Sequence, residues 1–204
     1  MGLSKRANPY REHQAEYVAT ETPRLVKTEP GRYLTITGDS EPGGEDFEHK
    51  ARALLRVAHT VQEAKKHGGR DFNLGKLEAL WWQRGRERDR QTDRPLWHWK
   101  LMVRVPDFVS EQDLGAAKSG GRDDLIRDVW LETIDEGECV QVLHVGPYEG
   151  EQQTVERMAE FARLEGRTFE GFHHEIYLTS PDEVPPEQLR TILRHQVVAA
   201  PIAP

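Results

Sequence analysis

The sequence predicts an α+β fold in which the order strand, helix, strand, strand occurs twice. In residues 31–105, β-branched and aromatic stretches flank one long pattern of helical periodicity. The same order of patterns returns in residues 138–198, although the two segments share little sequence identity. We therefore expect a duplicated β-α-β-β fold with a pseudo-two-fold axis, in which residues 106–137 connect the two halves.

The elements of the first half follow from local patterns. β-Branched and aromatic residues predict a strand over residues 32–37, and the turn formers of residues 38–44 end it. Apolar residues then recur at helical spacing through residues 47–66, and the pair Gly68-Gly69 ends this helix. Two further strands are expected over residues 76–82 and 96–105, with a charged hairpin loop at residues 83–94 between them.

The connector and the second half follow the same rules. Ser110, with Asp113 three residues later, predicts a capped helix that ends near residue 120, whereas residues 124–136 fit no single pattern. The second half is expected to contain a strand at 139–145, a helix at 151–165, a strand at 172–179, a helical turn at 185–189 and a strand at 191–198.

Length and composition favour one compact domain. The chain has 204 residues, of which 36% are hydrophobic, and this is enough for one sizeable core. We place the domain at residues 21–198. Residues 1–20 are expected to form a flexible N-terminal arm, and charged residues that continue to about Glu29 favour a solvated segment.

Charge and cysteine content argue against several classes of protein. A formal net charge of −7 is unfavourable for binding nucleic acid through phosphate neutralisation, and the basic patch at residues 84–88 includes an acid. No apolar run approaches the roughly 20 residues of a membrane span. The single cysteine, Cys139, cannot form an intramolecular disulfide, and the N-terminus lacks the apolar core of a signal peptide. We expect a cytoplasmic protein without nucleic-acid or membrane partners.

One acid in the strand at residues 172–179 is the leading candidate for a functional residue. Strand alternation places His173, Glu175 and Tyr177 on one face, and His174 and Ile176 on the other. An acid between two aromatic rings suits a planar or cationic ligand, or acid/base chemistry in a partly dry pocket. The alternative is a strand acid that is solvated or held in a structural ion pair. Desolvation by aromatic neighbours would raise its pKa and favours the functional interpretation.

The duplication gives this acid a counterpart. Residues 76–82 align with residues 173–179, so Glu78 takes the place in the first half that Glu175 takes in the second. If the two halves pack around a local two-fold axis, both strands line a shared groove. This geometry is a hypothesis.

Aromatic residues supply candidate walls for such a groove. Neighbouring tryptophans in a strand face opposite sides, so only Trp82 of the pair Trp81-Trp82 is expected on the face of Glu78. Trp97 and Trp99 share a face of their strand. The candidate ligand-binding residues are therefore Trp82, Trp97, Trp99, Tyr177 and His173.

Tyr148 lies in a strand-to-helix connection that contains Gly146 and Pro147. A loop tyrosine offers both a ring and a hydroxyl group, which can hydrogen-bond an acid or a substrate. The alternative is an ordinary turn between a strand and a helix. We place Tyr148 with Glu175 and Glu78 as the candidate catalytic residues.

No cofactor or metal is expected. His173 and His174 point to opposite faces of a strand, and neither they nor His144 belong to a paired-cysteine or helical histidine motif. Cys139 begins an apolar strand, where a buried and unreactive thiol is usual. No glycine-rich phosphate loop has the required spacing.

Six short segments, in this order, strongly resemble the GyrI-like small-molecule-binding family. The resemblance covers about residues 20–198, and the joint order of the segments is more specific than any one of them. They are LEALWW at 77–82, WHWK with PDF at 97–100 and 106–108, QVLHVGPY at 141–148, HHEIYL at 173–178, and PEQLRTILR at 186–194.

The resemblance implies a duplicated, SOUL-type fold with a groove between its halves for lipophilic, cationic or planar compounds. Some relatives in this family resemble hydrolases that open the cyclopropane ring of DNA-alkylating cyclopropanoid compounds, and the tryptophan-rich motifs of this chain are similar to that branch. In that role Glu175 would be the general base, with Glu78 as its alternative. Tyr148 or Tyr177 would hydrogen-bond the developing phenolate.

Two other functions remain open at this point. The protein could bind and sequester xenobiotic compounds without changing them, because a carboxylate attracts cations and rings stack on planar ligands. It could also inhibit gyrase, which the aromatic enrichment favours least. The sequence carries no signal for an oligomeric state.

Overall fold

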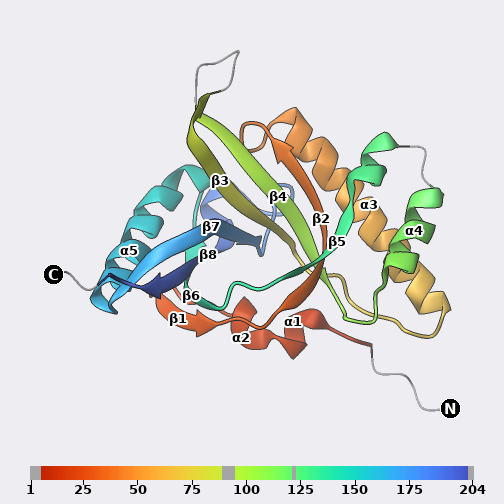
Figure 1. Ribbon diagram of the computed structural model, residues 1–204, viewed down its shortest axis with the longest axis horizontal. Helices are drawn as coiled ribbons and strands as arrows, with labels where there is room; N and C mark the ends of the chain where they lie inside the picture. The colour runs from red at the N-terminus through yellow and green to blue at the C-terminus, as the bar shows by residue number, and fades with distance from the viewer. Residues whose placement is uncertain (1–5, 89–94, 121–122, 202–204) are drawn as a thin grey trace. The chain divides into compact units, whose positions relative to one another are not determined.

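The computed structural model describes residues 6–88, 95–120 and 123–201 (Figure 1). The chain divides into two compact units. Unit 1 comprises residues up to Glu12 and Gly31–Ile134, and unit 2 comprises His13–Pro30 and the chain from Asp135 onward. Each unit contains one of the two predicted halves, so we describe each unit by itself.

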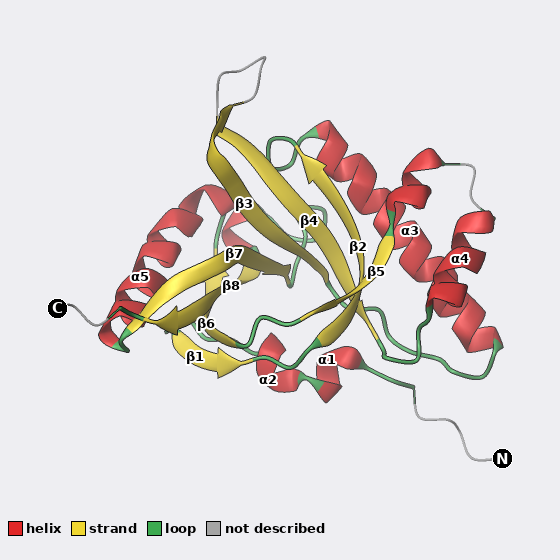
Figure 2. Ribbon diagram, in the orientation of Figure 1, coloured by secondary structure: helices red, strands yellow, loops and turns green. Residues whose placement is uncertain are grey.

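Unit 1 has the predicted order of strand, helix, strand, strand. Its strands are antiparallel neighbours in the order β3-β4-β2-β5. Its elements are α1 (Pro9–Glu12), β2 (Gly31–Asp39), α3 (Glu45–His67), β3 (Leu77–Arg88), β4 (Pro95–Val105), α4 (Glu111–Ser119), η1 (Asp124–Asp128) and β5 (Trp130–Ile134) (Figure 2).

Helix α3 covers one face of the unit 1 sheet. The ring of Phe47, from the first turn of α3, stacks on Trp81 with centroids 5.5 Å apart and meets the edge of Trp99 at 5.1 Å. Trp81 and Trp99 are cross-strand partners in β3 and β4, so their side chains share this face. The other face carries a second buried cluster that includes Tyr33, Leu80 and Met102.

Unit 2 repeats the same order of elements. Its strands are antiparallel neighbours in the order β1-β6-β8-β7. Its elements are α2 (Gln14–Tyr17), β1 (Arg24–Lys27), β6 (Glu138–Val145), η2 (Tyr148–Gly150), α5 (Glu151–Leu164), β7 (Arg167–Tyr177), η3 (Pro186–Gln188) and β8 (Arg190–Ala199). The β-α-β-β duplication predicted from the sequence is thus confirmed.

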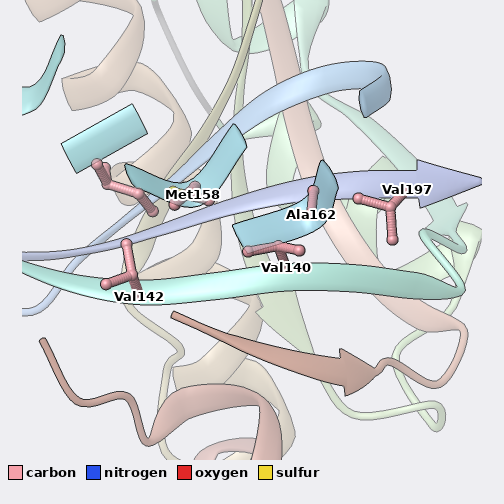
Figure 3. Close-up of a cluster of buried hydrophobic side chains, with 6 residues drawn as sticks. Val140, Val142, Met158, Ala162 and Val197 are labelled. Atoms are coloured by element: carbon pink, nitrogen blue, oxygen red, sulfur yellow. The ribbon is translucent and has the colours of Figure 1, made fainter. Parts of the chain in front are cut away.

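Helix α5 packs on one face of the unit 2 sheet (Figure 3). Met158 and Ala162 of the helix meet side chains from the two central strands, and all of them are buried. This apolar contact fixes which face of the sheet the helix covers. The strand side chains of the cluster are Val140, Val142, Leu193 and Val197.

Residues 16–27 of the N-terminal segment, which was expected to be solvated, are instead packed into unit 2. Glu16 and Tyr17 are each only 4% exposed, and β1 pairs with β6. The backbone oxygen of Glu16 accepts a hydrogen bond from the buried Arg194, and that of Val18 accepts one from Gln141. The high charge of this segment obscured its role, which is to satisfy buried donors through backbone carbonyls.

Three boundaries refine the sequence prediction. Residues 124–136, which fitted no pattern, contain the short helix η1 and the edge strand β5. Strand β3 continues to Arg88, so the first part of the expected loop at residues 83–94 is strand, and residues 89–94 lie outside the described residues. The predicted cap of α4 is confirmed, because Ser110 and Asp113 form a capping box.

Among the residues that the structure describes, no helix is both long enough and apolar enough to cross a membrane.

Candidate functional site

Strand β7 directs His173, Glu175 and Tyr177 toward helix α5. In the pairing of β7 with β8, Glu175 lies opposite Leu193, which belongs to the apolar cluster under α5. Cross-strand partners share a face, so Glu175 and the residues two positions away from it face the helix. The alternation predicted from the sequence is therefore present, with His174 on the opposite face.

Glu175 is held by two neighbours from its own strand. The hydroxyl group of Tyr177 donates a hydrogen bond of 2.6 Å to Glu175 Oε2, and His173 Nε2 lies 3.4 Å from Glu175 Oε1. The side chains of Glu175 and His173 are 13% and 19% exposed, respectively. Both carboxylate oxygens of this largely buried acid are thus already engaged.

A second acid, Glu151, completes the site. It is the first residue of α5, and its carboxyl group is hydrogen-bonded to that of Glu175. Its Oε1 atom is buried and has no hydrogen-bond partner. No sequence pattern singles out Glu151, because an acid in the first turn of a helix is ordinarily explained by the helix dipole.

The two carboxyl groups have opposite pKa shifts. Burial, and then the charge and hydrogen bond of Glu175, raise the pKa of Glu151 to about 9. Burial also acts to raise the pKa of Glu175, but hydrogen bonds from His173, Tyr177 and Glu151 and the charge of His173 outweigh it and lower that pKa. At neutral pH the pair therefore holds one proton, on Glu151, and one negative charge, on Glu175.

Tyr148 lies beside this pair. It begins the short helix η2 that leads into α5, and its ring meets the edge of the Tyr177 ring with centroids 6.0 Å apart. Burial, followed by the charges of Glu151 and Glu175, raises the pKa of Tyr148 to about 12. The structure thus brings Tyr148, Tyr177, His173 and Glu175 together, and the Tyr148 hydroxyl stays protonated.

His195 forms the far end of the site. Its ring stacks on Phe169 with centroids 4.1 Å apart and lies 6.0 Å from the ring of His173. Burial, and then the charge of His173, lower the pKa of His195 to about 4. His195 is therefore neutral at neutral pH, and the sequence offered no reason to select it.

Glu78 lies in unit 1, on the face of the sheet that points away from the helix. Its partner across the strands is Met102, on the face away from α3, and its side chain is fully buried. Glu175 faces the helix of unit 2. The two acids match in the order of the sequence, but they do not occupy equivalent faces of their sheets.

The tryptophans of unit 1 are divided between its two faces. Trp82 shares the face of Glu78 and stacks on His98 with centroids 5.9 Å apart. Trp97 and Trp99 share the opposite face, as the alternation predicted, and Trp97 meets Trp81 edge to face. Trp99 is fully buried against α3, so it stabilises the core of unit 1.

The opposite face of β7 carries a structural network. His174 Nδ1 lies 2.9 Å from Glu136 Oε2, and Arg194 Nη1 lies 3.0 Å from the same oxygen. Burial acts to raise the pKa of Glu136, but the charges and hydrogen bonds of His174 and Arg194 lower it to about 2. Burial and the Glu136 charge also raise the pKa of Cys139 to about 12, which agrees with an unreactive thiol.

One group of side chains has the spacing needed to hold a metal ion. One donor atom each from Glu151, His173 and Glu175 lie within 4.8 Å of one another. The histidines considered from the sequence do not converge. His144 contacts Thr154 Oγ1 at 3.0 Å, and His174 lies on the other face of β7. The proton shared by the two acids gives the same group a stable arrangement without a metal.

Comparisons with known proteins agree with this fold. A family model described as the GyrI-like small molecule binding domain matches residues 23–196. A crystal structure of an uncharacterised conserved protein from Listeria innocua is 32% identical, with a TM-score of 0.86 over 95% of this chain and all of the other. A structure from the same organism described as a hydrolase is also 32% identical, with a TM-score of 0.83 and the same coverage.

The fold extends to more distant proteins. The C-terminal domain of EcmrR is 12% identical, with a TM-score of 0.57 over 88% of this chain and 98% of that domain, and this likeness concerns the fold alone. Among curated proteins, none is similar enough to match this chain.

Proposed function

Because the chain belongs to the family of GyrI-like small-molecule-binding domains, we propose that it binds flat, lipophilic aromatic compounds and hydrolyses cyclopropanoid DNA-alkylating compounds, which it thereby detoxifies. The observation that carries the proposal is the buried carboxylate of Glu175, which aromatic hydroxyl and imidazole groups hold in its ionised form. The similar protein from Listeria innocua that is described as a hydrolase supports a reaction rather than binding alone.

The reaction adds one water molecule to the strained ring. Glu175 removes a proton from that water, whose oxygen forms a bond to the cyclopropane carbon. The carbon–carbon bond of the ring breaks, and its electron pair moves to the conjugated carbonyl oxygen, which becomes a phenolate. The phenolate takes a proton from solvent and Glu175 returns its own to solvent, so atoms and charge balance.

Other residues hold the substrate and the developing charge. Tyr148 keeps its proton and is 37% exposed, so its hydroxyl group is suited to donate a hydrogen bond to the phenolate. The rings of Tyr177 and His173 contribute to the wall beside Glu175. In unit 1, the half-buried Trp82 is proposed to stack on a planar ligand, whereas Trp97 and Trp99 lie on the opposite face of the sheet, where Trp99 packs in the core.

Glu78 is the alternative base. It is fully buried in unit 1, where the sequence placed it as the counterpart of Glu175. General base catalysis supplies about 10²–10⁴-fold, so orientation and stabilisation of the oxyanion must supply any further acceleration. Separate Glu78→Gln and Glu175→Gln variants therefore identify which acid removes the proton.

The experiment is an incubation of the purified protein with a cyclopropanoid compound, followed by mass spectrometry. We expect a ring-opened product heavier than the substrate by one water. Glu175→Gln should abolish turnover and retain affinity for neutral planar ligands, whereas Glu160→Gln, which removes an exposed acid from α5, should leave turnover unchanged. Substrate recovered intact from the wild-type protein would exclude hydrolysis of that compound.

Binding without chemistry is the second candidate. The hydrogen bond from Tyr177 favours it, because a carboxylate that accepts a short hydrogen bond is a weaker base. In that case the ligand would be recovered unchanged from a tight complex. Inhibition of gyrase, the function that the aromatic residues favour least, would be tested by a supercoiling assay.

A further inference from the structure

We propose that Glu151 is a positioning residue for this site: its protonated carboxyl group donates a hydrogen bond to Glu175 and keeps the single negative charge of the pair on Glu175. The inference rests on the proposed hydrolysis for its catalytic consequence. The arrangement of the two carboxyl groups is tested separately from it.

The contacts of the two acids are unequal. Glu175 accepts a hydrogen bond from Tyr177 and lies 3.4 Å from an imidazole nitrogen of His173. Glu151 has a buried Oε1 without any hydrogen-bond partner, and its carboxyl group is hydrogen-bonded to that of Glu175. A carboxylate is stabilised by the donors around it, so the charge belongs on Glu175 and the proton on Glu151.

The surroundings of the pair supply little positive charge. No lysine or arginine forms an ion pair with Glu151 or Glu175 among the described residues. From η2, the negative charge of Glu149 acts against a second ionised carboxyl group, and Tyr148 adds no charge because its hydroxyl stays protonated. Two carboxylates in a buried site without a lysine or arginine partner repel each other strongly, so one of them keeps its proton.

The remaining titratable groups near the pair do not change this assignment. On β6, His144 lies next to Gly150, the residue before Glu151, and its ring nitrogens are engaged by Thr154 and Pro147. On β8, His195 stays neutral beside His173. The positive end of the α5 dipole favours an ionised Glu151, whereas burial and the charge of Glu175 raise its pKa.

This arrangement predicts different effects for two substitutions at one position. Glutamine at position 151 can still donate a hydrogen bond through its amide and cannot ionise. Alanine can do neither. If Glu151 acts by donating to Glu175, glutamine preserves the base and alanine weakens it.

The kinetic experiment compares pH profiles of cyclopropanoid hydrolysis. The wild-type profile should lose activity as Glu151 ionises near pH 9. For Glu151→Gln we expect kcat at pH 7 within about threefold of wild type and no alkaline loss near pH 9. For Glu151→Ala we expect kcat to fall about tenfold with KM nearly unchanged, and the acidic limb to move to higher pH, because Glu175 has lost a donor.

Two kinetic outcomes would overturn the inference. One is an equal loss of kcat in Glu151→Gln and Glu151→Ala, which would mean that the donor function is irrelevant. The other is an alkaline limb that persists in Glu151→Gln. Glu160→Gln serves as the control for loss of one acid from α5, and it should retain the whole wild-type profile.

A measurement on ligand-free protein separates this inference from the proposed function. Carbon-13 NMR of protein labelled at glutamate side-chain carboxyl groups should show one carboxyl group that titrates near pH 9, and Glu151→Gln should remove that signal. Absence of any such group would reject the shared proton, even in a protein that hydrolyses its substrate. Absence of turnover with the titration intact would reject only the hydrolase function.

Discussion

The backbone of Gly38 lies directly against the indole ring of Trp99. The two residues are cross-strand partners in β2 and β4, and a Cβ atom at position 38 would lie 2.3 Å from two atoms of the ring. Trp99 is fully buried, packs against Phe47 of α3 and donates a hydrogen bond to Ser40 Oγ at 3.3 Å. The glycine therefore makes room for the largest fully buried side chain of unit 1.

The substitution Gly38→Ala should lower the free energy of unfolding by about 1–3 kcal/mol, because the indole ring must move in a closely packed core. Gly115→Ala is the matched control. Gly115 lies inside α4 with no atom within 4 Å of the added methyl group. Alanine there should raise stability by up to about 1 kcal/mol through helix propensity. Urea denaturation measures both, and an equal response at the two sites would contradict the packing argument.

The buried network behind β7 should be costly to break. Glu136→Gln leaves Arg194, which is 1% exposed, without its carboxylate, and we expect a loss of about 3–5 kcal/mol in the free energy of unfolding. Glu138→Gln is the control, because its ion pair with Arg167 lies at the surface and should contribute little. Thermal and urea unfolding measure the loss of stability in both variants. Equal losses in Glu136→Gln and Glu138→Gln would show that Glu136 is not the essential partner of Arg194.

The same network gives an acid-dependent stability. The pKa of Glu136 in the folded protein is about 2, below its ordinary value of 4.5. The unfolded chain therefore binds more protons between these values, and stability is present above pH 4.5 and lost as the pH falls toward 2. Relative to wild type, Glu136→Gln should lack this part of the acid dependence in unfolding curves measured from pH 6 to pH 2.5.

Glu151 should affect stability in the opposite direction. Its pKa is raised to about 9 in the folded protein from 4.5, so the folded state holds a proton that the unfolded chain releases. Its contribution is largest below pH 4.5 and is lost as the pH rises toward 9. Above pH 4.5 the buried Glu151 therefore destabilises the folded protein increasingly as the pH rises. Glu151→Gln removes this destabilisation and should raise the melting temperature at pH 8 more than at pH 5. A shift of equal size at both pH values would argue against a raised pKa.

The two tryptophans Trp82 and Trp99 should separate binding from stability. Trp99→Ala should cost about 3–5 kcal/mol of folding free energy, because it removes a fully buried ring. Trp82 is half-buried, so Trp82→Ala should cost clearly less and should weaken the affinity for a flat aromatic probe about tenfold. Urea denaturation and a fluorescence titration measure the two effects. Unchanged probe affinity in Trp82→Ala would remove this residue from the binding surface.

The sequence was sufficient for the order of elements but not for the packing of the N-terminal segment. Helical and strand periodicities are strong in both halves, and the capping pair Ser110 and Asp113 marks a helix start without tertiary information. The segment around Glu16 gave the opposite impression, because its charged residues favour solvent. Its burial depends on a carbonyl that meets Arg194, a contact 178 residues away in sequence.

The site could be predicted only in part, because some of its features are local in sequence and others depend on tertiary packing. Alternation along one strand is a local property, so it correctly placed His173, Glu175 and Tyr177 on one face. Which face a helix covers is a tertiary property, and alternation cannot supply it. For that reason the sequence missed Glu151 at the start of α5 and treated Glu78 as the equivalent of Glu175.

The irregular pairing of β7 has a consequence for insertions and deletions. Between Phe169 and His173 the strand advances four positions while its partner β8 advances two, from Val197 to His195. Gly171, with a φ of +73°, lies in this excess. Strand β7 thus has two residues more than β8 in this interval. Because two is an even number, the alternation of side chains between the two faces is unchanged, and both Phe169 and Glu175 face α5. Deletion of one residue here would turn Glu175 to the opposite face of the sheet, whereas deletion of two residues would leave it facing α5. Natural length variation in this strand should therefore occur in steps of two.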